Sequence, residues 1–406
     1  MFGVEYENII FVNNFRKVIF VNYRRKKLLQ LFVILFTMIL LSGCNGKKTE
    51  SDENIVIKIG VILDFSNEKA SESEQMFKVM QLAADEINDN GGVLKEHYQV
   101  ELIKKDDKGE ALNAAAAYYQ LQEEGALAVI GSNTPECMKQ LMDISNQVNI
   151  SIITPTVSDD FVVKAADFAF QSCISDKYIT QAMISYLCEE IGEKKVAVIY
   201  NPLDSDEIVL YEDFITSALS KNMEIAYAAE YDAALDESII EVFKAIEKSG
   251  TRYVYVPAGK ENYTKIILNA AKEAGYSGSF LGMLKQIEEN DTCGYDIIVP
   301  VNMSADSEKK DTLAFIDKVK TRFDIVQDIK NTDKLRTSYD AVYMIIDAIE
   351  KGYLPTSATV ALKLPFLEGN LLTGYYEIGA YGNVKKAVDI ICVKDSDSKY
   401  ITTVFE

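Results

Sequence analysis

The sequence predicts an α/β protein of two lobes, each built on a doubly wound parallel sheet. Residues 57–64 form a short apolar, β-branched run typical of a buried parallel strand, and apolar residues then recur at helical spacing from Met76 to Ile87. Strands alternate with helices of ten to sixteen residues through the rest of the chain. About 350 residues also exceed what one hydrophobic core usually organises, which favours two lobes.

The first strand–loop–helix unit ends at Asn88-Asp89-Asn90-Gly91-Gly92, where glycine can adopt the left-handed conformation that closes a helix. The run IKIGVILDFS…LAADEINDNGG resembles the opening of bacterial solute-binding proteins of the Leu/Ile/Val-binding type, and residues 87–92 match their Ile-Asn-x-x-Gly-Gly signature. The same order of elements continues over roughly 340 residues. The resemblance implies the type I periplasmic binding protein fold, with two lobes joined by a three-passage hinge.

Residues 1–43 are predicted to be a signal peptide, of which residues 1–22 are unusual and suggest a start codon assigned too early. Residues 24–27 are basic, and the fourteen mostly apolar residues 28–41 are short for a membrane span of about 20 residues. Leu41-Ser42-Gly43-Cys44 resembles a bacterial lipobox, which implies that Cys44 carries the lipid and that residues 44–54 form an anchored tether. An uncleaved membrane anchor is the alternative.

The chain is acidic, with a formal net charge of −20. Removal of residues 1–43 takes away six basic and two acidic residues, which leaves 36 basic and 60 acidic residues and a net charge of −24. Such a surface repels nucleic acid and anionic lipid, so we expect no nucleic-acid partner.

Cysteine and histidine content argues against an enzyme or a metal site. Five cysteines follow Cys44. None is in CxxC spacing and their number is odd, which implies no full disulfide framework. They are therefore interpreted as buried apolar side chains. His97 is the single histidine, and its polar turn suggests a solvated residue. A nucleophile with a neighbouring base is therefore not found, and we expect no catalysis and no cofactor.

Further elements follow from apolar runs and from helix start signals. Thr134, Pro135 and Glu136 are typical of an N-cap, a first helical position and an acidic first turn, and they follow an apolar strand. The expected strands are residues 99–103, 126–131, 150–154, 168–174, 195–201, 250–257 and 296–302, and the expected helices are residues 110–122, 176–191, 207–221, 239–249 and 262–274.

The resemblance assigns three hinge passages. Residues 168–176 resemble the first passage, which closes with Asp176, and residues 296–302 resemble the return. A third passage is expected near Tyr353, after a helix that begins with the family's Tyr339-Asp340-Ala341, and residues 372–383 resemble the closing hairpin. We therefore expect residues 55–174 with 302–353 in the first lobe and residues 175–301 with 354–406 in the second.

Ligands bind outside the carboxyl ends of parallel strands, so the loops at those ends are the candidate site. A helix N-terminus can hold a carboxylate, and the family uses the loop before residue 135 in this way. Ser132 and Thr134 are candidates, whereas Pro135 stands where a hydroxyl-bearing residue is usual and cannot donate. The remaining candidates implied by the resemblance are Glu72, Thr156, Val157, Ser158, Asp176 and Tyr200. An ordinary capped turn is the alternative for residues 155–158.

Glu72 replaces an aromatic residue that often flanks the ligand, and with Glu136 it suggests an acidic mouth. One hypothesis is a cationic ligand, or one that is not a free α-amino acid; the alternative is that both acids face solvent. The resemblance implies a lipid-anchored monomer on the extracytoplasmic face of the membrane that delivers a small solute, such as an amino acid, to an ABC permease. A sensor or cell-envelope regulator of the same fold remains the alternative.

Overall fold

The computed structural model describes residues 55–95, 97–159, 164, 166–231, 236–257, 261–282, 292–301, 310–323, 333–379, 382–395 and 397–405. Residues Asn54–Glu406 form one compact unit. The predicted signal peptide, lipobox and tether lie outside the described residues, as does Asn302, the last residue of the expected return passage. Within the described part of the chain, no helix combines the length and the apolar character needed to cross a bilayer.

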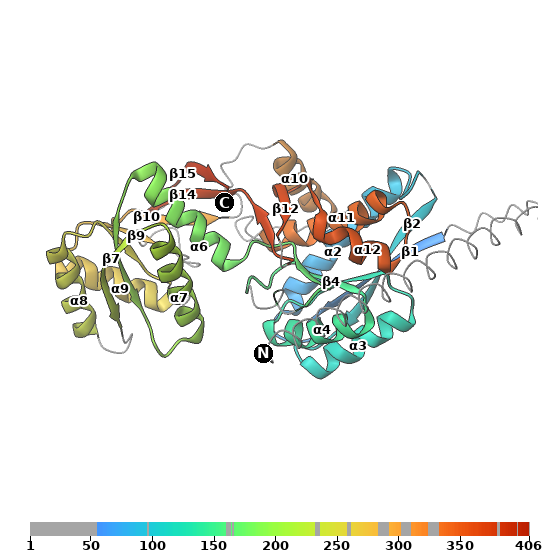
Figure 1. The fold of residues 1–406 in the computed structure, drawn as a ribbon, viewed down its shortest axis with the longest axis horizontal. Coiled ribbons are helices and arrows are strands. Elements are labelled where there is room, and N and C mark those ends of the chain that lie inside the picture. The colour runs from blue at the N-terminus through green and yellow to red at the C-terminus, as the bar shows by residue number, and fades with distance from the viewer. Residues whose placement is uncertain are drawn as a thin grey trace, which may run out of the picture. The chain divides into compact units, whose positions relative to one another are not determined.

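The first sheet is parallel and has the strand order β2-β1-β3-β4-β5. Strands β1, β2 and β4 of this sheet are labelled in Figure 1. Its elements are β1 (Ile55–Leu63), α2 (Ala70–Asp89), β2 (Tyr98–Asp106), α3 (Ala111–Glu123), β3 (Ala128–Gly131), α4 (Pro135–Val148), β4 (Ser151–Thr154) and β5 (Ala169–Gln171). Alternate residues of β1 enter two cores: Ile59 and Val61 pack with α2, and Ile62 packs with α3 and α4. Helices therefore cover both faces, as a doubly wound sheet requires.

The second sheet has the order β15-β14-β10-β9-β8-β6-β7. Its elements are α6 (Asp176–Ser185), a π-helical turn η1 (Tyr186–Ile191), β6 (Lys195–Tyr200), α7 (Ser205–Ser220), β7 (Glu224–Glu230), α8 (Asp236–Ser249), β8 (Tyr253–Tyr255), α9 (Glu261–Ala274), β9 (Ser279–Leu281), β10 (Ile297–Val301), β14 (Val388–Lys394) and β15 (Asp397–Val404). Strands β6 to β10 are parallel, and the antiparallel pair β14–β15 extends the edge at β10. The two-lobed α/β architecture is confirmed, and the hairpin at residues 388–404 is an addition to it.

The segment from α10 to β13 packs in the core of the first lobe. It comprises α10 (Lys310–Phe323), α11 (Asp333–Gly352), α12 (Ser357–Lys363), a 3-10 turn η3 (Leu364–Phe366), β11 (Glu368–Leu371), β12 (Gly374–Ile378) and β13 (Val384–Lys386). Val360, Tyr376 and Val384 belong to the same buried cluster as Ile57 of β1. The expected passage near Tyr353 is therefore wrong, and so is the assignment of residues 354–386 to the second lobe, because the apolar side chains of this segment are buried with those of α2 and α11. The chain crosses instead between β13 and β14.

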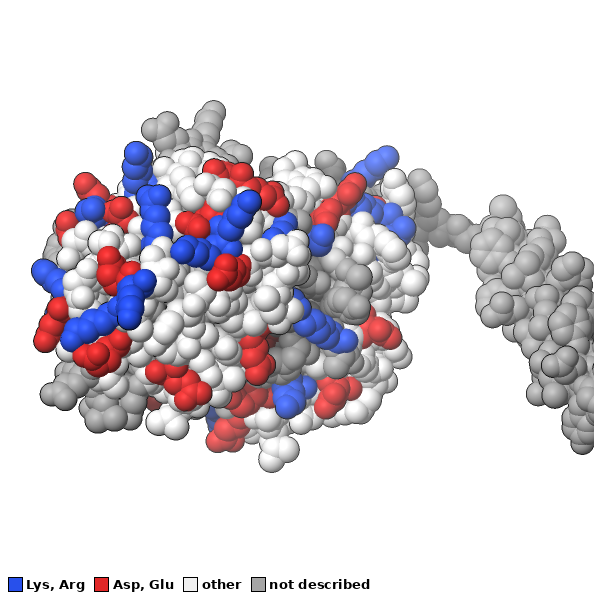
Figure 2. Space-filling model, turned by 60° about the vertical axis from the view of Figure 1, so that its left-hand side comes forward, with Lys and Arg blue, Asp and Glu red and all other residues white. Residues whose placement is uncertain are grey.

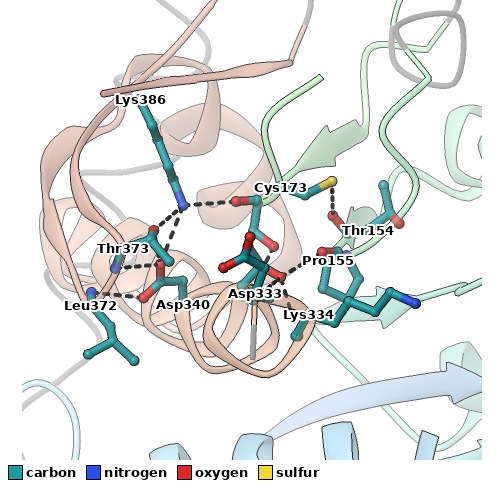
Figure 3. A network of polar contacts seen from close by, with 11 residues as sticks. Thr154, Pro155, Cys173, Asp333, Lys334, Asp340, Leu372, Thr373 and Lys386 are labelled. Atoms are coloured by element: carbon teal, nitrogen blue, oxygen red, sulfur yellow. Dashed lines mark hydrogen bonds and ion pairs between the residues drawn. The ribbon is translucent and has the colours of Figure 1, made fainter. Parts of the chain in front are cut away.

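A buried ion pair lies beside two crossing segments (Figure 3). Lys386 and Asp340 are both fully buried, and the Lys386 ammonium lies 3.3 Å from an Asp340 carboxylate oxygen. The same ammonium donates to the backbone carbonyl of Ser172 at 2.8 Å and to the Thr373 hydroxyl at 2.5 Å. Burial lowers the pKa of Lys386, while the Asp340 charge opposes this effect. Asp340 also accepts the backbone N–H groups of Leu372 and Thr373. Every donor and acceptor in this network thus has a partner.

Exposed charges are mixed in sign. On the face drawn in Figure 2, acidic and basic side chains are interspersed. Pairs such as Lys221–Glu189 and Lys351–Asp347 lie partly in solvent, where each contributes little to stability.

We expect Lys386→Met to lower the free energy of unfolding by about 3–5 kcal/mol, because it leaves the Asp340 carboxylate buried without its cation. Lys351→Met is the matched control. Its ion pair with Asp347 is 2.8 Å long but its side chain is 43% exposed, so the loss should stay below about 1 kcal/mol. Urea unfolding of both variants measures the difference. Equal losses would contradict a special role for the buried pair.

Candidate functional site

The candidate site is the carboxyl edge of the first sheet, where β1, β3 and β4 end. Strand β3 ends at Gly131, whose φ of +142° and closeness to β1 leave no room for a side chain: a Cβ there would lie 2.0 Å from the Ile62 carbonyl oxygen. Glycine thus lets the chain turn into residues 132–134 directly beside β1.

Asn133 fastens this turn to the neighbouring elements. Its side-chain oxygen accepts the Asp64 backbone N–H at 3.2 Å, and its amide donates to the Ser73 hydroxyl of α2 at 2.9 Å. Asn133 is 3% exposed. The loop after β3 is therefore fixed both to the end of β1 and to the first turn of α2.

Ser132 is fully buried and donates its hydroxyl proton to Asp107 at 2.6 Å. Its backbone carbonyl accepts the Thr154 hydroxyl at 3.0 Å. Ser132 therefore stabilises the loops after β3 and β4. Its hydroxyl proton is donated to Asp107 and is not free for a ligand.

Thr134 is the N-cap residue of α4 and Pro135 follows it in the first turn, as the sequence predicts. The Thr134 side chain nevertheless does not cap the helix, and its buried hydroxyl oxygen has no hydrogen-bond partner in the described part of the chain. The Cys137 thiol lies near this hydroxyl without satisfying it, and burial raises the pKa of that thiol to about 11. The Thr156 hydroxyl, in the loop after β4, is likewise buried and unpartnered among the described residues. Two candidate hydroxyls thus remain unsatisfied, a state that costs free energy unless something bonds to them.

Val157, Ser158 and Asp176 form hydrogen bonds within the loop after β4 and the first crossing. The Val157 carbonyl accepts the side-chain amide of Gln171 at 2.9 Å, so this acceptor is occupied. The Ser158 hydroxyl donates to the Asp176 carboxylate at 3.0 Å, and the Asp176 N–H donates to the Ser158 carbonyl at 3.2 Å. Ser158 and Asp176 therefore join the loop after β4 to the start of α6.

Tyr200 ends β6 in the second sheet. Its ring stacks on Tyr211 with 4.0 Å between centroids, and its hydroxyl donates to Glu230 at 3.2 Å. Burial, followed by the contact with Glu230, raises the pKa of Tyr200. Its side chain is thus held by residues of its own lobe.

Glu72 forms an ion pair with Lys334 of α11 at 2.6 Å, and both side chains are partly exposed. Glu136 is exposed. Because the Glu72 charge is compensated, the two acids do not form an uncompensated acidic mouth, and the hypothesis of a cationic ligand loses its main support. Lys334 was not predicted, since it lies 262 positions from Glu72 in the chain.

Three carboxylates, Asp64, Asp106 and Asp107, lie together behind these loops, with oxygen atoms within 4.8 Å of one another. Such a group can hold a cation. Here, however, the three accept hydrogen bonds from loop groups: Asp64 from the Asn67 N–H, Asp106 from the Phe65 N–H, and Asp107 from the Gly109 N–H, each at 2.9 Å. The three carboxylates therefore have a structural role, which is to hold these loops in place. His97 is exposed, as predicted.

The five cysteines that the structure describes are free thiols: Cys137 and Cys173 are buried, whereas Cys188, Cys293 and Cys392 are only partly buried. The interpretation of all five as buried side chains thus holds for two. Burial raises the pKa of Cys173 to about 12, which keeps it protonated and unreactive at neutral pH.

A family model described as periplasmic binding protein matches residues 56–379. The chain belongs to the periplasmic binding protein family. Members of this family are solute-binding proteins that act outside the cytoplasm and are in general not enzymes. The match begins in β1, ends just after β12, and so includes every first-lobe loop described above.

This periplasmic binding protein is similar in sequence to two named relatives. A Leu/Ile/Val-binding protein homolog 3 of Brucella melitensis is 29% identical over 146 residues, which cover 36% of this chain and 39% of the relative. An amino acid binding protein of Pseudomonas aeruginosa is 28% identical over 163 residues, which cover 40% of this chain and 42% of the relative. The aligned region thus spans about two-fifths of each relative.

Solved structures share the fold over most of the chain. An ABC transporter substrate-binding protein of Desulfitobacterium hafniense in complex with Leu has a TM-score of 0.69 at 20% identity and covers 85% of this chain and 100% of its own. A branched-chain amino acid transporter substrate-binding protein of Streptococcus pneumoniae in complex with isoleucine has a TM-score of 0.63 at 20% identity, covering 86% and 99%. A Rhodopseudomonas palustris solute-binding protein in complex with benzoate has a TM-score of 0.63 at 15% identity, covering 86% and 97%.

We expect Gly131→Ala to be far more harmful than Gly125→Ala, although both glycines have positive φ. A Cβ at Gly125 meets nothing within 4 Å, so the backbone penalty of about 1–2 kcal/mol stands alone. A Cβ at Gly131 collides with the Ile62 backbone, so the loss should exceed roughly 3 kcal/mol. Urea unfolding measures both. Equal losses would mean that the turn at 131 can move away from β1.

Burial raises the pKa of the Asp107 carboxyl, and the charges of Asp64 and Asp106 add to this, against the hydrogen bonds from Ser132 and Gly109. A carboxyl with a raised folded-state pKa favours the fold while it is protonated and loses that contribution as pH rises through the folded-state pKa. Asp107→Asn stays neutral. As the pH rises from about 4 to about 7, the unfolding free energy of Asp107→Asn should therefore increase relative to that of the wild type.

Asp143→Asn controls for the removal of one carboxylate, because Asp143 is exposed on α4. Urea unfolding across this pH range gives the difference between each variant and the wild type. A constant difference for Asp107→Asn would show that Asp107 has the same pKa in the folded and unfolded states.

Proposed function

We propose that this protein is an extracytoplasmic, lipid-anchored solute-binding protein that binds a small solute carrying a carboxylate, in the first place an amino acid, and delivers it to an ABC importer. The observation that carries the proposal is the pair of buried, unpartnered hydroxyls of Thr134 and Thr156 after β3 and β4. Each can donate one hydrogen bond, and a ligand carboxylate offers acceptors for both.

The position of these hydroxyls supports a carboxylate as the recognised group. They follow neighbouring parallel strands, since Ile130 of β3 pairs with Ile153 of β4. The first turn of α4 also begins at this edge, and the free N–H groups of a helix start attract negative charge. The ligands of the three structural neighbours, leucine, isoleucine and benzoate, share a carboxylate and differ elsewhere.

Lipid anchoring is part of the proposal. The basic residues 24–27, the apolar residues 28–41 and the sequence Leu41-Ser42-Gly43-Cys44 support secretion followed by lipid attachment at Cys44. Residues 44–54 would then tether β1 to the membrane. The protein would act there as a monomer without a cofactor.

Hinge closure is the proposed mechanism. The first lobe comprises residues 55–174 with the segment that packs in its core up to Lys386, and the second comprises residues 175–301 with 388–405. The crossings lie after β5, after β10 and between β13 and β14. Few backbone points join the lobes, which favours closure on a ligand that contacts both. Tyr200 is the second-lobe residue proposed for that contact.

We expect a carboxylate solute to raise the thermal unfolding temperature of residues 45–406. A ligand at a hundred times its dissociation constant adds about 2.7 kcal/mol to the stability, enough for a shift of several degrees. The panel contains amino acids, aromatic carboxylates, polyamines and small peptides. Thr134→Val and Thr156→Val should each weaken binding by roughly 10- to 100-fold, because one hydrogen bond to a charged group is lost.

The ligand-free stability of both variants should be unchanged or higher, because valine removes a hydroxyl that has no partner. Ser151→Ala is the matched control: Ser151 also has a buried, unpartnered hydroxyl among the described residues, but it lies at the start of β4, away from the carboxyl edge. Its affinity should equal that of the wild type. A shift with polyamines alone, or none with any carboxylate, would overturn the proposal.

A further inference from the structure

Lys69 places a positive charge at the proposed carboxylate site. It is the N-cap residue of α2, in the loop after β1, and its side chain is half-buried. The ammonium reaches across to the loop after β3 and donates a hydrogen bond to the backbone carbonyl of Asn133. That carbonyl belongs to the peptide group that joins Asn133 to Thr134. The ammonium is therefore held next to the residue that caps α4.

This placement is fixed by the surrounding contacts. Asn133 is held by Asp64 and by Ser73, and Ser73 lies one helical turn after Lys69, whose carbonyl accepts the Ser73 N–H at 2.8 Å. Both ends of the Lys69 contact thus belong to one hydrogen-bonded unit made of the end of β1, the first turn of α2 and the loop after β3.

The charge of Lys69 is not neutralised within the described part of the chain. Its ammonium forms no ion pair with any acid that the structure describes, whereas Lys334, also near the start of α2, is paired with Glu72. The nearby triad of aspartates accepts hydrogen bonds from its own loops. Lys69 also lies at the positive ends of α2 and α4, where a cation is unfavourable. An anion placed there would be stabilised by both helix ends and by the ammonium.

We propose that the Lys69 ammonium is the charge partner of the ligand carboxylate, with the Thr134 and Thr156 hydroxyls as its hydrogen-bond donors. The inference rests on the proposed function and deepens it. Pro135 stands where the Leu/Ile/Val-binding type carries a hydroxyl-bearing residue, and Lys69 supplies the missing donor from the neighbouring loop. The ligand class is then an anionic carboxylate rather than a cationic solute, and the carboxylate lies at the start of α4.

The test is calorimetric titration of residues 45–406 with leucine, isoleucine and benzoate, and with leucinamide and benzamide as analogues that lack the carboxylate. The wild type should bind at least one carboxylate and should bind the matching amide at least 10-fold more weakly. Lys69→Met should weaken carboxylate binding by roughly 10- to 100-fold. Lys69→Arg keeps the charge and should recover most of the affinity. Raising the salt concentration should weaken binding to the wild type more than to Lys69→Met.

Lys78→Met is the matched control, because Lys78 is exposed on the same helix, nine positions further along. Its affinity should be that of the wild type. Ligand-free Lys69→Met should unfold close to the wild-type temperature, since removal of a cation from two helix starts offsets the lost hydrogen bond to the Asn133 carbonyl. A purely structural lysine would instead lower that temperature. If the wild type binds a carboxylate and Lys69→Met binds it within twofold, the role of Lys69 is overturned while the proposed function stands. If the wild type binds none of the carboxylates, both are overturned.

Discussion

The buried contact between Lys386 and Asp340 is the interaction on which the rest of the first lobe depends. Helix α11 carries Asp340, and one turn earlier it carries Thr337. The Thr337 hydroxyl donates to the Pro155 carbonyl at 2.7 Å, and the Thr337 carbonyl accepts the Ser172 hydroxyl at 2.9 Å. The same helix thus holds the loop after β4 and the first crossing, while Lys386 holds that crossing to the last one. A hinge can bend repeatably only if its fixed points are well defined, and fully partnered buried polar groups provide such definition.

The carboxyl edge of the first sheet combines polar groups that have partners in the described part of the chain with polar groups that have none. The acids Asp64, Asp106 and Asp107 are acceptors for their own loops, and Glu72 has Lys334. Among the described residues, the buried groups of this edge without a hydrogen-bond partner are the hydroxyls of Thr134 and Thr156 and the side-chain oxygen of Gln171. The Lys69 ammonium bonds to the Asn133 carbonyl but to no carboxylate that the structure describes. The Lys69 ammonium and the two hydroxyls favour an anion at the start of α4, although the chain as a whole carries a net charge of −20. Local geometry, rather than total charge, therefore decides which ligand is favoured.

The sequence was sufficient for the fold and for the edge that carries the site, because both follow from local patterns. The apolar run of β1, the helical spacing in α2 and the Thr134-Pro135 start of α4 each predict one element, and parallel topology then brings the strand ends together. Residues 374–386 could not be assigned in this way. Strand alternation shows that a hairpin has an apolar side but not which core receives it, and here Tyr376 and Val384 enter the first core. Lys386 illustrates the same limit, since a lysine is buried only when partners far away in the chain meet it.

Lys69 is a different case, because a signal for it existed. It lies in the loop that follows the first strand, at the sheet edge where ligands are expected, three positions before Glu72, which departs from the Leu/Ile/Val-binding pattern. Without the contact to Asn133, however, it reads as one more solvated lysine. Two buried hydroxyls and a cation at two helix starts each lower the stability of the ligand-free protein. Destabilising groups of this kind are expected at sites where a bound ligand compensates for them. The free energy lost in the ligand-free protein then helps to discriminate between ligands, since a carboxylate can accept hydrogen bonds from hydroxyls and pair with an ammonium, whereas the matching amide carries no charge.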